Sequence, residues 1–311
     1  LASSPPAQTD AKQPKILLLS FCDGIGVVPW AANIVWPGCV TTYGWEILPH
    51  ATAVAEKNIP NYFHMGDLLH TSDTDIENIL CQEEYDAIIP VGGFPCQDNS
   101  TLRDDRPGIA GPKSGLIFSI AELVARFRKA RDRLGLRSLF QGLWENVLGT
   151  TEEDAEVVKE LMGTFSPFVV DAEEASFARR PRLFWVEWTI NERPHEHWTF
   201  RGPYPHLQGW ASLPDRPPWH NTGYQLLGER MVTRTCPGEF SSSPTFRTKG
   251  LAKADAGTRK RWKEDGHRLS TFQYREDTLL WRGQDWRMPS PDELDELMGL
   301  PRGYTKVPGV S

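Results

Sequence analysis

The sequence predicts an α/β fold built on a mostly parallel β-sheet, with a smaller loop-rich module attached. Apolar runs of strand length alternate with segments of helical periodicity over the first 190 residues or so. A glycine turn follows the first apolar run, and from about residue 191 the periodicity fades while Pro, Trp, His and Gly accumulate. Strand–helix alternation favours a parallel sheet covered on both faces, in which ligands bind beyond the carboxyl ends of the strands.

The expected elements follow from these patterns in chain order. Buried apolar runs predict strands at 15–21, 40–46, 86–91, 140–147, 167–175 and 182–188. Helical periodicity predicts helices at 51–58, 115–134, 151–163 and 290–300. The helix at 151–163 has an acid-rich first turn, and the last helix has Ser290 as its N-cap followed by a proline.

The same patterns divide the chain into three parts. Residues 1–14, rich in Pro, Ser and Ala, indicate a flexible leader. Residues 15–190, together with about 287–311, form the expected main α/β domain, and 191–286 form the loop-rich module. No segment has the pattern of a signal peptide or the roughly 18 apolar residues of a membrane span. The sequence therefore gives no indication of membrane association.

Charge and cysteine content restrict the class of partner. The net charge is −7, but residues 247–268 hold eight Lys/Arg and three acids, a local balance of +5. Phosphates respond to local basicity within a Debye length, so this segment is a candidate nucleic-acid surface, although a solvated charged loop explains it equally well. Five cysteines without a CxxC pair favour a reducing compartment and argue against a zinc site.

The turn "SFCDGIG" (20–26) is the first candidate site. Gly24 and Gly26 allow close approach of a ligand to the backbone, but they do not complete the G-x-G-x-x-G pattern of a dinucleotide dehydrogenase. Glu46 ends the second strand and is placed to hold ribose hydroxyls, and Asp67 follows the third strand and could accept from an adenine amino group. Each acid alone is typical of a surface; in series they indicate an adenosine-containing cofactor.

The loop "GGFPCQDNS" (92–100) is the second candidate site. Gly92, Gly93 and Pro95 shape a turn that carries Cys96 out of the preceding strand, whereas most lone cysteines are small core residues. A thiolate is the competent nucleophile, and it needs help from nearby cations or N–H groups to form at neutral pH. Arg180 and Arg182 are candidates for that help.

Six motifs in one order carry a family resemblance. DGIG, the Glu after strand two, GD, GGFPCQ, ENV (145–147) and RPRLFW (180–185) together resemble the DNA (cytosine-5) methyltransferase family. The match runs from about Lys15 to Trp188 and resumes at 243–250 and 287–304; "PCQDNS" and "GLPRGYT" are similar to the animal de novo branch. The resemblance implies a Rossmann-like methyltransferase sheet, with 191–286 as a target-recognition domain.

The resemblance also implies catalytic roles. Cys96 would add to C6 of a cytosine, while Glu145 would bind N3 and the exocyclic amine and protonate N3. Arg182 would donate to O2 and orient Glu145, Arg180 would brace the site, and Asn146 would hold the loop. The methyl donor would be S-adenosylmethionine, and the target base would be flipped out of the duplex.

Two further sets of residues follow from the same resemblance. The family's cofactor-packing Phe aligns with Cys22, one position after Phe21. The expected S-adenosylmethionine-binding residues are Phe21, Cys22, Asp23, Gly24, Ile25, Gly26, Glu46, Ile47, Asp67, Leu68, Gly93, Pro95 and Leu116. The expected contacts to double-stranded DNA are Ser100, Arg247, Lys249, Arg259, Lys260, Arg261 and Lys263.

Three readings of function stay open. The family's last motif, a GNAVPP-like segment, is not seen before Ser311; it is either missing from this sequence, supplied by a partner chain or second copy, or lost. The alternatives to a DNA methyltransferase are an inactive DNA- or partner-binding relative and an RNA cytosine-5 methyltransferase. Against the latter, the sequence lacks the Cys-Phe-Thr tripeptide of the tRNA-modifying branch. The expected location is nuclear in a eukaryote and cytoplasmic otherwise.

Overall fold

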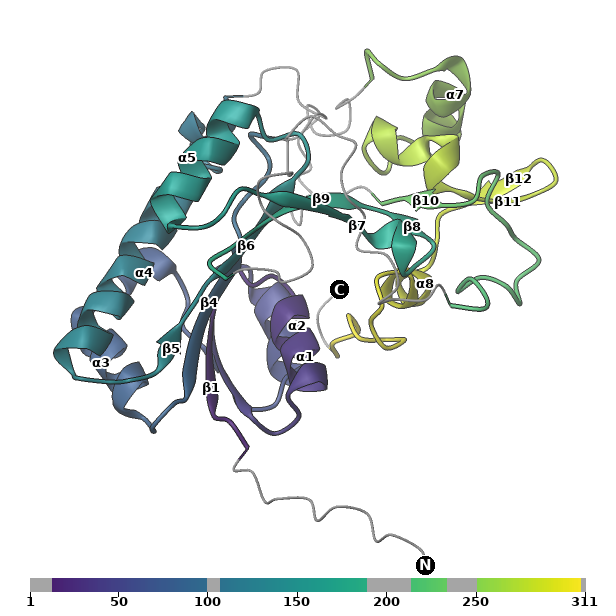
Figure 1. The fold of residues 1–311 in the computed structure, drawn as a ribbon. Coiled ribbons are helices and arrows are strands. Elements are labelled where there is room, and N and C mark those ends of the chain that lie inside the picture. The colour runs from purple at the N-terminus through teal and green to yellow at the C-terminus, as the bar shows by residue number, and fades with distance from the viewer. Residues whose placement is uncertain (1–12, 100–106, 189–213, 234–250, 309–311) are drawn as a thin grey trace, which may run out of the picture. The chain divides into compact units, whose positions relative to one another are not determined.

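The computed structural model describes residues 13–99, 107–188, 214–233 and 251–308 (Figure 1). By its contacts the chain forms two compact units. The first comprises residues up to Val91 together with Glu122–Gly142, and the second comprises Gly92–Ala121 and the chain from Leu143 onward. Each unit is described by itself below.

The first unit is built on parallel strands. These are β1 (Ile16–Phe21), β2 (Val40–Trp45), β3 (Tyr62–His64), β4 (Ala87–Gly93, whose last two residues belong to the second unit) and β5 (Leu139–Phe140). Their order is β3-β2-β1-β4, with β5 beside β4. The pairs β1–β2, β2–β3 and β4–β5 are all parallel. Every residue of β1 is buried, as the continuous apolar run predicts for a strand covered on both faces.

Helices cover these strands. They are α1 (Val27–Val35), α2 (Pro49–Asn58), α3 (Asp73–Cys81) and the greater part of α4 (Leu116–Arg133). Figure 1 shows α1 and α2 on one face of the strands and α3 on the other. An aromatic stack forms the core beneath them: Phe21 lies on Trp45 at a centroid distance of 4.8 Å, and Trp45 meets the edge of Phe127 at 6.0 Å.

Antiparallel strands organise the second unit. Its strands β6 (Leu143–Val147), β9 (Pro181–Val186) and β7 (Phe168–Asp171) lie in the order β6-β9-β7, and both pairs are antiparallel. Helix α5 (Glu152–Met162) begins at the N-cap Thr151, and the indole of Trp185 on β9 donates to Ala155 O at 3.2 Å. The short strands β8 (Ala178–Arg179) and β10 (Met231–Val232) form a parallel pair.

The remaining described elements of the second unit are small. They are α7 (Ala256–Glu264), α8 (Pro291–Leu297), the hairpin β11 (Leu280–Arg282) and β12 (Asp285–Arg287), and the 3-10 turns Gly108–Ala110, Ala172–Glu174, Thr271–Tyr274 and Glu276–Thr278. A compact apolar cluster joins several of them: Ala178, Trp219, Met231, Leu280 and Leu297. Helix α8 begins with a capping box between Ser290 and Glu293, as its sequence predicts.

The prediction of an α/β fold with a mostly parallel sheet is confirmed. The predicted helices are present, within a few residues of their expected ends. The expected strand at 140–147 is divided into β5 and β6, and the one at 167–175 ends at Asp171, whose side chain caps a 3-10 turn by accepting from Glu173 N. None of the described helices combines the length and the apolar character that crossing a membrane requires.

Candidate active site

A hydrogen bond from the buried side chain of Asn146 holds the segment before Cys96 in place. Phe94 is buried and packs near Trp185, with ring centroids 6.4 Å apart. Asn146, in β6, donates from Nδ2 to Phe94 O at 3.1 Å and accepts from Val147 N at 2.8 Å. Its amide is therefore used to hold the end of β4 to β6, which agrees with the loop-holding role expected for it.

A second buried side chain, Asp98, fixes the turn beyond Cys96. Its Oδ2 accepts from the backbone N–H groups of Lys113 and Ser114 at 2.8 and 2.9 Å, and Ser114 Oγ donates to Pro95 O at 2.6 Å. Gly111 lies so close that a Cβ there would overlap the Asp98 carboxylate. The loop that holds Cys96 is thus tied to the segment before α4 by a carboxylate for which the sequence predicted no role.

Strand pairing brings Glu145 and Arg182 together. In the β6–β9 register Glu145 lies opposite Phe184 and Arg182 opposite Val147, so the two side chains are diagonal neighbours. Arg182 Nε lies 2.8 Å from Glu145 Oε1, with only 14% of the arginine side chain and 30% of the glutamate side chain exposed. Gly93 makes room for the pair, because a Cβ at that position would lie 2.9 Å from Glu145 Oε2.

Charge interactions link four side chains of the second unit. Burial raises the pKa of the Glu145 carboxyl, while Arg182 and then Arg180 oppose that rise. Burial also raises the pKa of the Cys96 thiol; Arg182 lowers it, Glu145 raises it and Arg180 lowers it. The backbone N–H of Arg180 donates to Asp171 Oδ1 at 2.7 Å, which fixes the arginine where β9 begins. The structure therefore brings Cys96, Glu145, Arg180 and Arg182 together, as the sequence analysis expected.

The glycine turn belongs to the first unit. Cys22 and Gly24 both have left-handed backbone angles, with φ of 53° and 58°. Gly24 N donates to Glu46 Oε2 at 2.8 Å, while Glu46 Oε1 accepts from the N–H groups of Ile47 and Leu48 at 2.8 and 2.9 Å. Glu46 therefore braces the turn, and its Oε2 has the capacity to accept one more hydrogen bond.

The expected cofactor contact of Phe21 is wrong. Its ring is fully buried at the end of β1 and stacked on Trp45, so it is part of the core and offers no face to a ligand. Cys22 follows it as a partly buried thiol whose pKa is raised to about 12, chiefly by burial.

The other expected cofactor residues differ in accessibility. Ile47 is 70% exposed beside Glu46, whereas Leu68 is buried, and Asp67 Oδ1 accepts from Leu69 N at 3.0 Å. Asp23, Ile25 and Gly26 lie in the turn itself. Gly93, Pro95 and Leu116 belong to the second unit.

One expected DNA contact is also wrong. Arg261 is buried: its Nε donates to Tyr274 O at 2.8 Å, its guanidinium lies 5.2 Å from the Trp281 ring centroid, and it is 3.7 Å from Glu276. It therefore holds α7 to its neighbours. Arg259, Lys260 and Lys263 are exposed on the same helix. Ser100, Arg247 and Lys249 lie outside the described residues.

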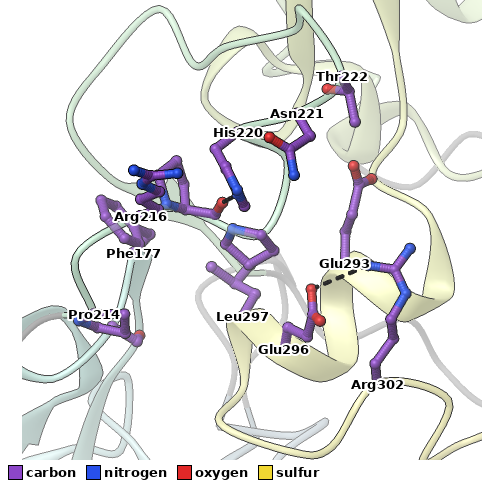
Figure 2. Close-up of a pocket in the computed structure, with 13 residues that line it drawn as sticks. Phe177, Pro214, Arg216, His220, Asn221, Thr222, Glu293, Glu296, Leu297 and Arg302 are labelled. Atoms are coloured by element: carbon purple, nitrogen blue, oxygen red, sulfur yellow. Dashed lines mark hydrogen bonds and ion pairs between the residues drawn. The ribbon is translucent and has the colours of Figure 1, made fainter.

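A separate pocket of about 450 Å³ lies in the second unit (Figure 2). Phe177 and Leu297 form apolar parts of its wall, and His220 lies on one side. Arg302 on another side pairs with Glu296 at 3.4 Å. None of the four clustered residues lines this pocket, so it is no part of the candidate active site. Across the described ranges, no group of three or more His, Cys, Asp or Glu side chains is arranged to hold a metal ion.

Comparison with known proteins shows the fold. No protein-family model matches the chain. The structure of the Entamoeba histolytica methyltransferase EhMeth is similar at 14% identity over 96% of this chain and 91% of that one, with a TM-score of 0.52. The Schizosaccharomyces pombe Dnmt2 methyltransferase gives 14% identity over 96% and 90% of the two chains (TM-score 0.48). A Spodoptera frugiperda DNMT2 mutant gives 13% over 96% and 92% (TM-score 0.47).

The structure that carries the likeness, EhMeth, is named only as a methyltransferase, so the expected likeness to the de novo branch is not supported. At such identities a likeness establishes the fold alone, and the Entamoeba structure carries that conclusion. The chain has a methyltransferase-like α/β fold.

Proposed function

We propose that this protein methylates C5 of cytosine in double-stranded DNA, through a covalent bond between Cys96 and C6 of the base. The observation that carries the proposal is the ion pair between Arg182 and Glu145, 2.8 Å long, in a cluster whose charges act on the Cys96 thiol. A nucleophile, a proton donor and a cationic orienting group are the parts that this chemistry requires.

Cys96 is the nucleophile. Its thiolate attacks C6, and the two guanidinium groups favour the charged form against the burial that disfavours it. Electrons displaced from the C5–C6 bond move toward N3, which makes C5 nucleophilic. Once C5 has taken the methyl group of a bound donor, departure of the C5 proton and of the sulfur would restore the aromatic base and the free Cys96 thiolate.

Glu145 is the general acid. Burial raises its pKa, so the carboxyl can carry a proton and donate it to N3 as the sulfur attacks. Arg182 holds Oε1 and thereby fixes the direction of the carboxyl. A guanidinium has five N–H donors, so Arg182 can orient Glu145 and also donate to O2 of the base.

The glycine turn fits an adenosine-containing methyl donor. Space is open at Gly24, Glu46 Oε2 can accept from a ribose hydroxyl, and the exposed Ile47 offers an apolar surface to an adenine ring. When bound, S-adenosylmethionine supplies an electrophilic methyl group. We assign Cys22, Asp23, Gly24, Glu46, Ile47 and Asp67 to hold it.

The nucleic acid is the part of the proposal that rests on surface charge. Arg259, Lys260 and Lys263 on α7 are exposed and suited to phosphate contacts, and 191–286 is proposed as the target-recognition domain. A stacked cytosine hides C6, so the target must be flipped out at a cost of a few kcal/mol. The absence of a Cys-Phe-Thr tripeptide from the sequence favours DNA over tRNA.

The test is incubation with tritiated S-adenosylmethionine and either duplex DNA or tRNA. The proposal expects label on C5 of cytosine in DNA and none with Cys96→Ser. Label only in tRNA would move the substrate to RNA. Binding of DNA and cofactor without any label would make this an inactive relative.

A further inference from the structure

A chain of hydrogen bonds lies directly behind the glycine turn. Asp23 accepts through Oδ1 from Ser20 Oγ and through Oδ2 from the hydroxyl of Tyr62, the latter at 2.8 Å. Its own backbone N–H donates to Trp45 O at 3.1 Å, and its carbonyl accepts from Gly26 N at 3.1 Å. One aspartate thereby connects the end of β1, the turn, and a tyrosine from β3.

The Tyr62 ring packs directly against a glycine. Gly44, in β2, lies beneath the Tyr62 ring, and a Cβ at that position would overlap the phenol oxygen and its ring carbons. Gly44 does not have a left-handed backbone, so close approach explains the glycine there. Three consecutive strands therefore contribute to one contact: Ser20 from β1, Gly44 from β2 and Tyr62 from β3.

We propose that Tyr62 is a positioning residue for the cofactor-binding turn, acting through Asp23, and that this contact makes cofactor affinity depend on pH. The inference rests on the proposed use of the turn to bind S-adenosylmethionine. Asp23 and Ser20 both lie in the turn "SFCDGIG", but no role was predicted for Ser20 or for Tyr62, and Tyr62 belongs to none of the motifs.

The ionised form of Asp23 has no donor and accepts one hydroxyl hydrogen bond at each of its oxygens. Burial raises the pKa of Asp23 to about 6, against the hydrogen bonds from Ser20 and Tyr62, which lower it. Burial and Asp23 raise the pKa of Tyr62, so the phenol remains a donor over this pH range. When Asp23 takes up a proton, one of its oxygens becomes a donor, and both accepted hydrogen bonds lose the strength that the negative charge gave them.

Two other charged groups act on Asp23, and their contribution to the pH dependence must be distinguished from that of Asp23 itself. Glu46 raises the pKa of Asp23, and His64 lowers it. His64 Nε2 lies 2.8 Å from Glu46 O and 3.3 Å from Thr52 Oγ1, so a charge on this ring acts on the same strand ends. A His64→Gln variant is therefore the control for the pH dependence.

The sign of the effect follows from linkage. If the ordered turn binds the cofactor, binding favours ionised Asp23, so affinity is full above the pKa of about 6 and falls as the pH drops through it. Loss of the Tyr62 hydroxyl removes a hydrogen bond that stabilises the carboxylate. The fall in affinity should then occur at a higher pH than in the native protein.

The experiment is calorimetric titration of the full chain with S-adenosylmethionine between about pH 5 and 8, the range in which this carboxyl ionises. We expect Tyr62→Phe to bind about 10- to 150-fold more weakly at pH 7.5, as for a hydrogen bond to a charged group, and to lose affinity at a higher pH. Tyr43→Phe, one residue before Gly44 and stacked on Phe63, is the matched control and should bind normally. Asp23→Asn should bind weakly with no pH dependence in this range.

Two results would overturn the inference, and they differ from a failure of the proposed function. Native affinity and an unshifted pH profile in a folded Tyr62→Phe protein would show that Tyr62 does not position the turn. A pH dependence that disappears in His64→Gln would assign the titration to the histidine. If the native protein binds no S-adenosylmethionine at any pH, the proposed function is wrong, and the inference about Tyr62, which rests on it, is wrong as well. The native pH profile alone tests the inference if Tyr62→Phe does not fold.

Discussion

The two candidate site regions each contain a carboxyl group whose pKa is raised by burial, and the groups that oppose this rise differ between them. In the glycine turn, hydrogen bonds from the hydroxyl groups of Ser20 and Tyr62 oppose the rise that burial causes in the pKa of Asp23. In the candidate active-site cluster, the guanidinium groups of Arg182 and Arg180 oppose the rise that burial causes in the pKa of Glu145. Neutral donors hold a carboxylate in one geometry, whereas cations also set the charge felt by a neighbouring thiol.

This difference indicates that the two regions would contribute to different steps of the proposed reaction. Variants in the cluster should change the chemical step and leave cofactor affinity alone. Variants in the turn should change cofactor affinity and leave the chemistry of the bound complex alone. The predictions below test that separation, beginning with the largest effect.

Cys96→Ser should lower the rate of methyl transfer by about 10⁴-fold or more, as removal of a nucleophile does. Its affinities for duplex DNA and S-adenosylmethionine should stay within about twofold of native, because a thiol contributes little binding energy of its own. Single-turnover assays and calorimetry measure the two quantities. Lost cofactor binding in a folded Cys96→Ser protein would break the separation.

Glu145→Gln should lower the rate by about 10²- to 10³-fold, the usual contribution of a general acid, and cofactor affinity should not change. Because the proposed mechanism uses Glu145 in its protonated form, the rate of the native protein should fall as the pH rises through the raised pKa of this carboxyl. The pH profile of the single-turnover rate checks this. If the rate of Glu145→Gln still falls with rising pH as the native rate does, another group is the general acid.

Replacing Arg259, Lys260 and Lys263 together by Gln should weaken duplex binding and reduce the slope of log affinity against log salt by about 2 to 3. Arg261→Gln is the contrast on the same helix. Because Arg261 is buried against Tyr274 and Trp281, it should lower the melting temperature and leave the salt slope unchanged. An unaltered slope in the triple variant would place the DNA surface off α7.

Asp98→Asn should lower stability by about 1 to 3 kcal/mol, because the N–H groups of Lys113 and Ser114 would then donate to a neutral amide oxygen, and hydrogen bonds to a charged carboxylate are stronger. The rate of methyl transfer should fall as the Cys96 loop loosens, with cofactor affinity nearly native. Asp132→Asn, at an exposed position, is the matched control. Denaturant unfolding and single-turnover rates distinguish a loosened loop from general destabilisation.

Much of the fold could be predicted from local patterns, and the site only in part. Apolar runs located β1, β2 and β4, helical periodicity with an acid-rich first turn located α5, and the Ser290 cap located α8, because these signals lie within a few residues of the element. Tyr62 escaped prediction because its partner Asp23 is 39 residues away and no pattern joins them. Asp98 escaped for the same reason, since its partners are backbone groups 15 and 16 residues later.

The two corrected residues show a further limit. Phe21 and Arg261 were assigned by position in a motif and by charge, and both are buried. Periodicity at the end of a strand does not say which of two adjacent residues, Phe21 or Cys22, turns toward the ligand. A basic run on a short helix likewise does not say which member faces the core.

The most direct test of the central claim is trapping with duplex DNA that carries 5-fluorocytosine at the target base. The fluorine cannot leave C5 as a proton does, so the bond between sulfur and C6 should persist. With S-adenosylmethionine present, peptide mass spectrometry should find the modified base attached at Cys96 and no adduct in Cys96→Ser. Methylation of ordinary cytosine by the same preparation, with no covalent complex or with one at another residue, would contradict the account.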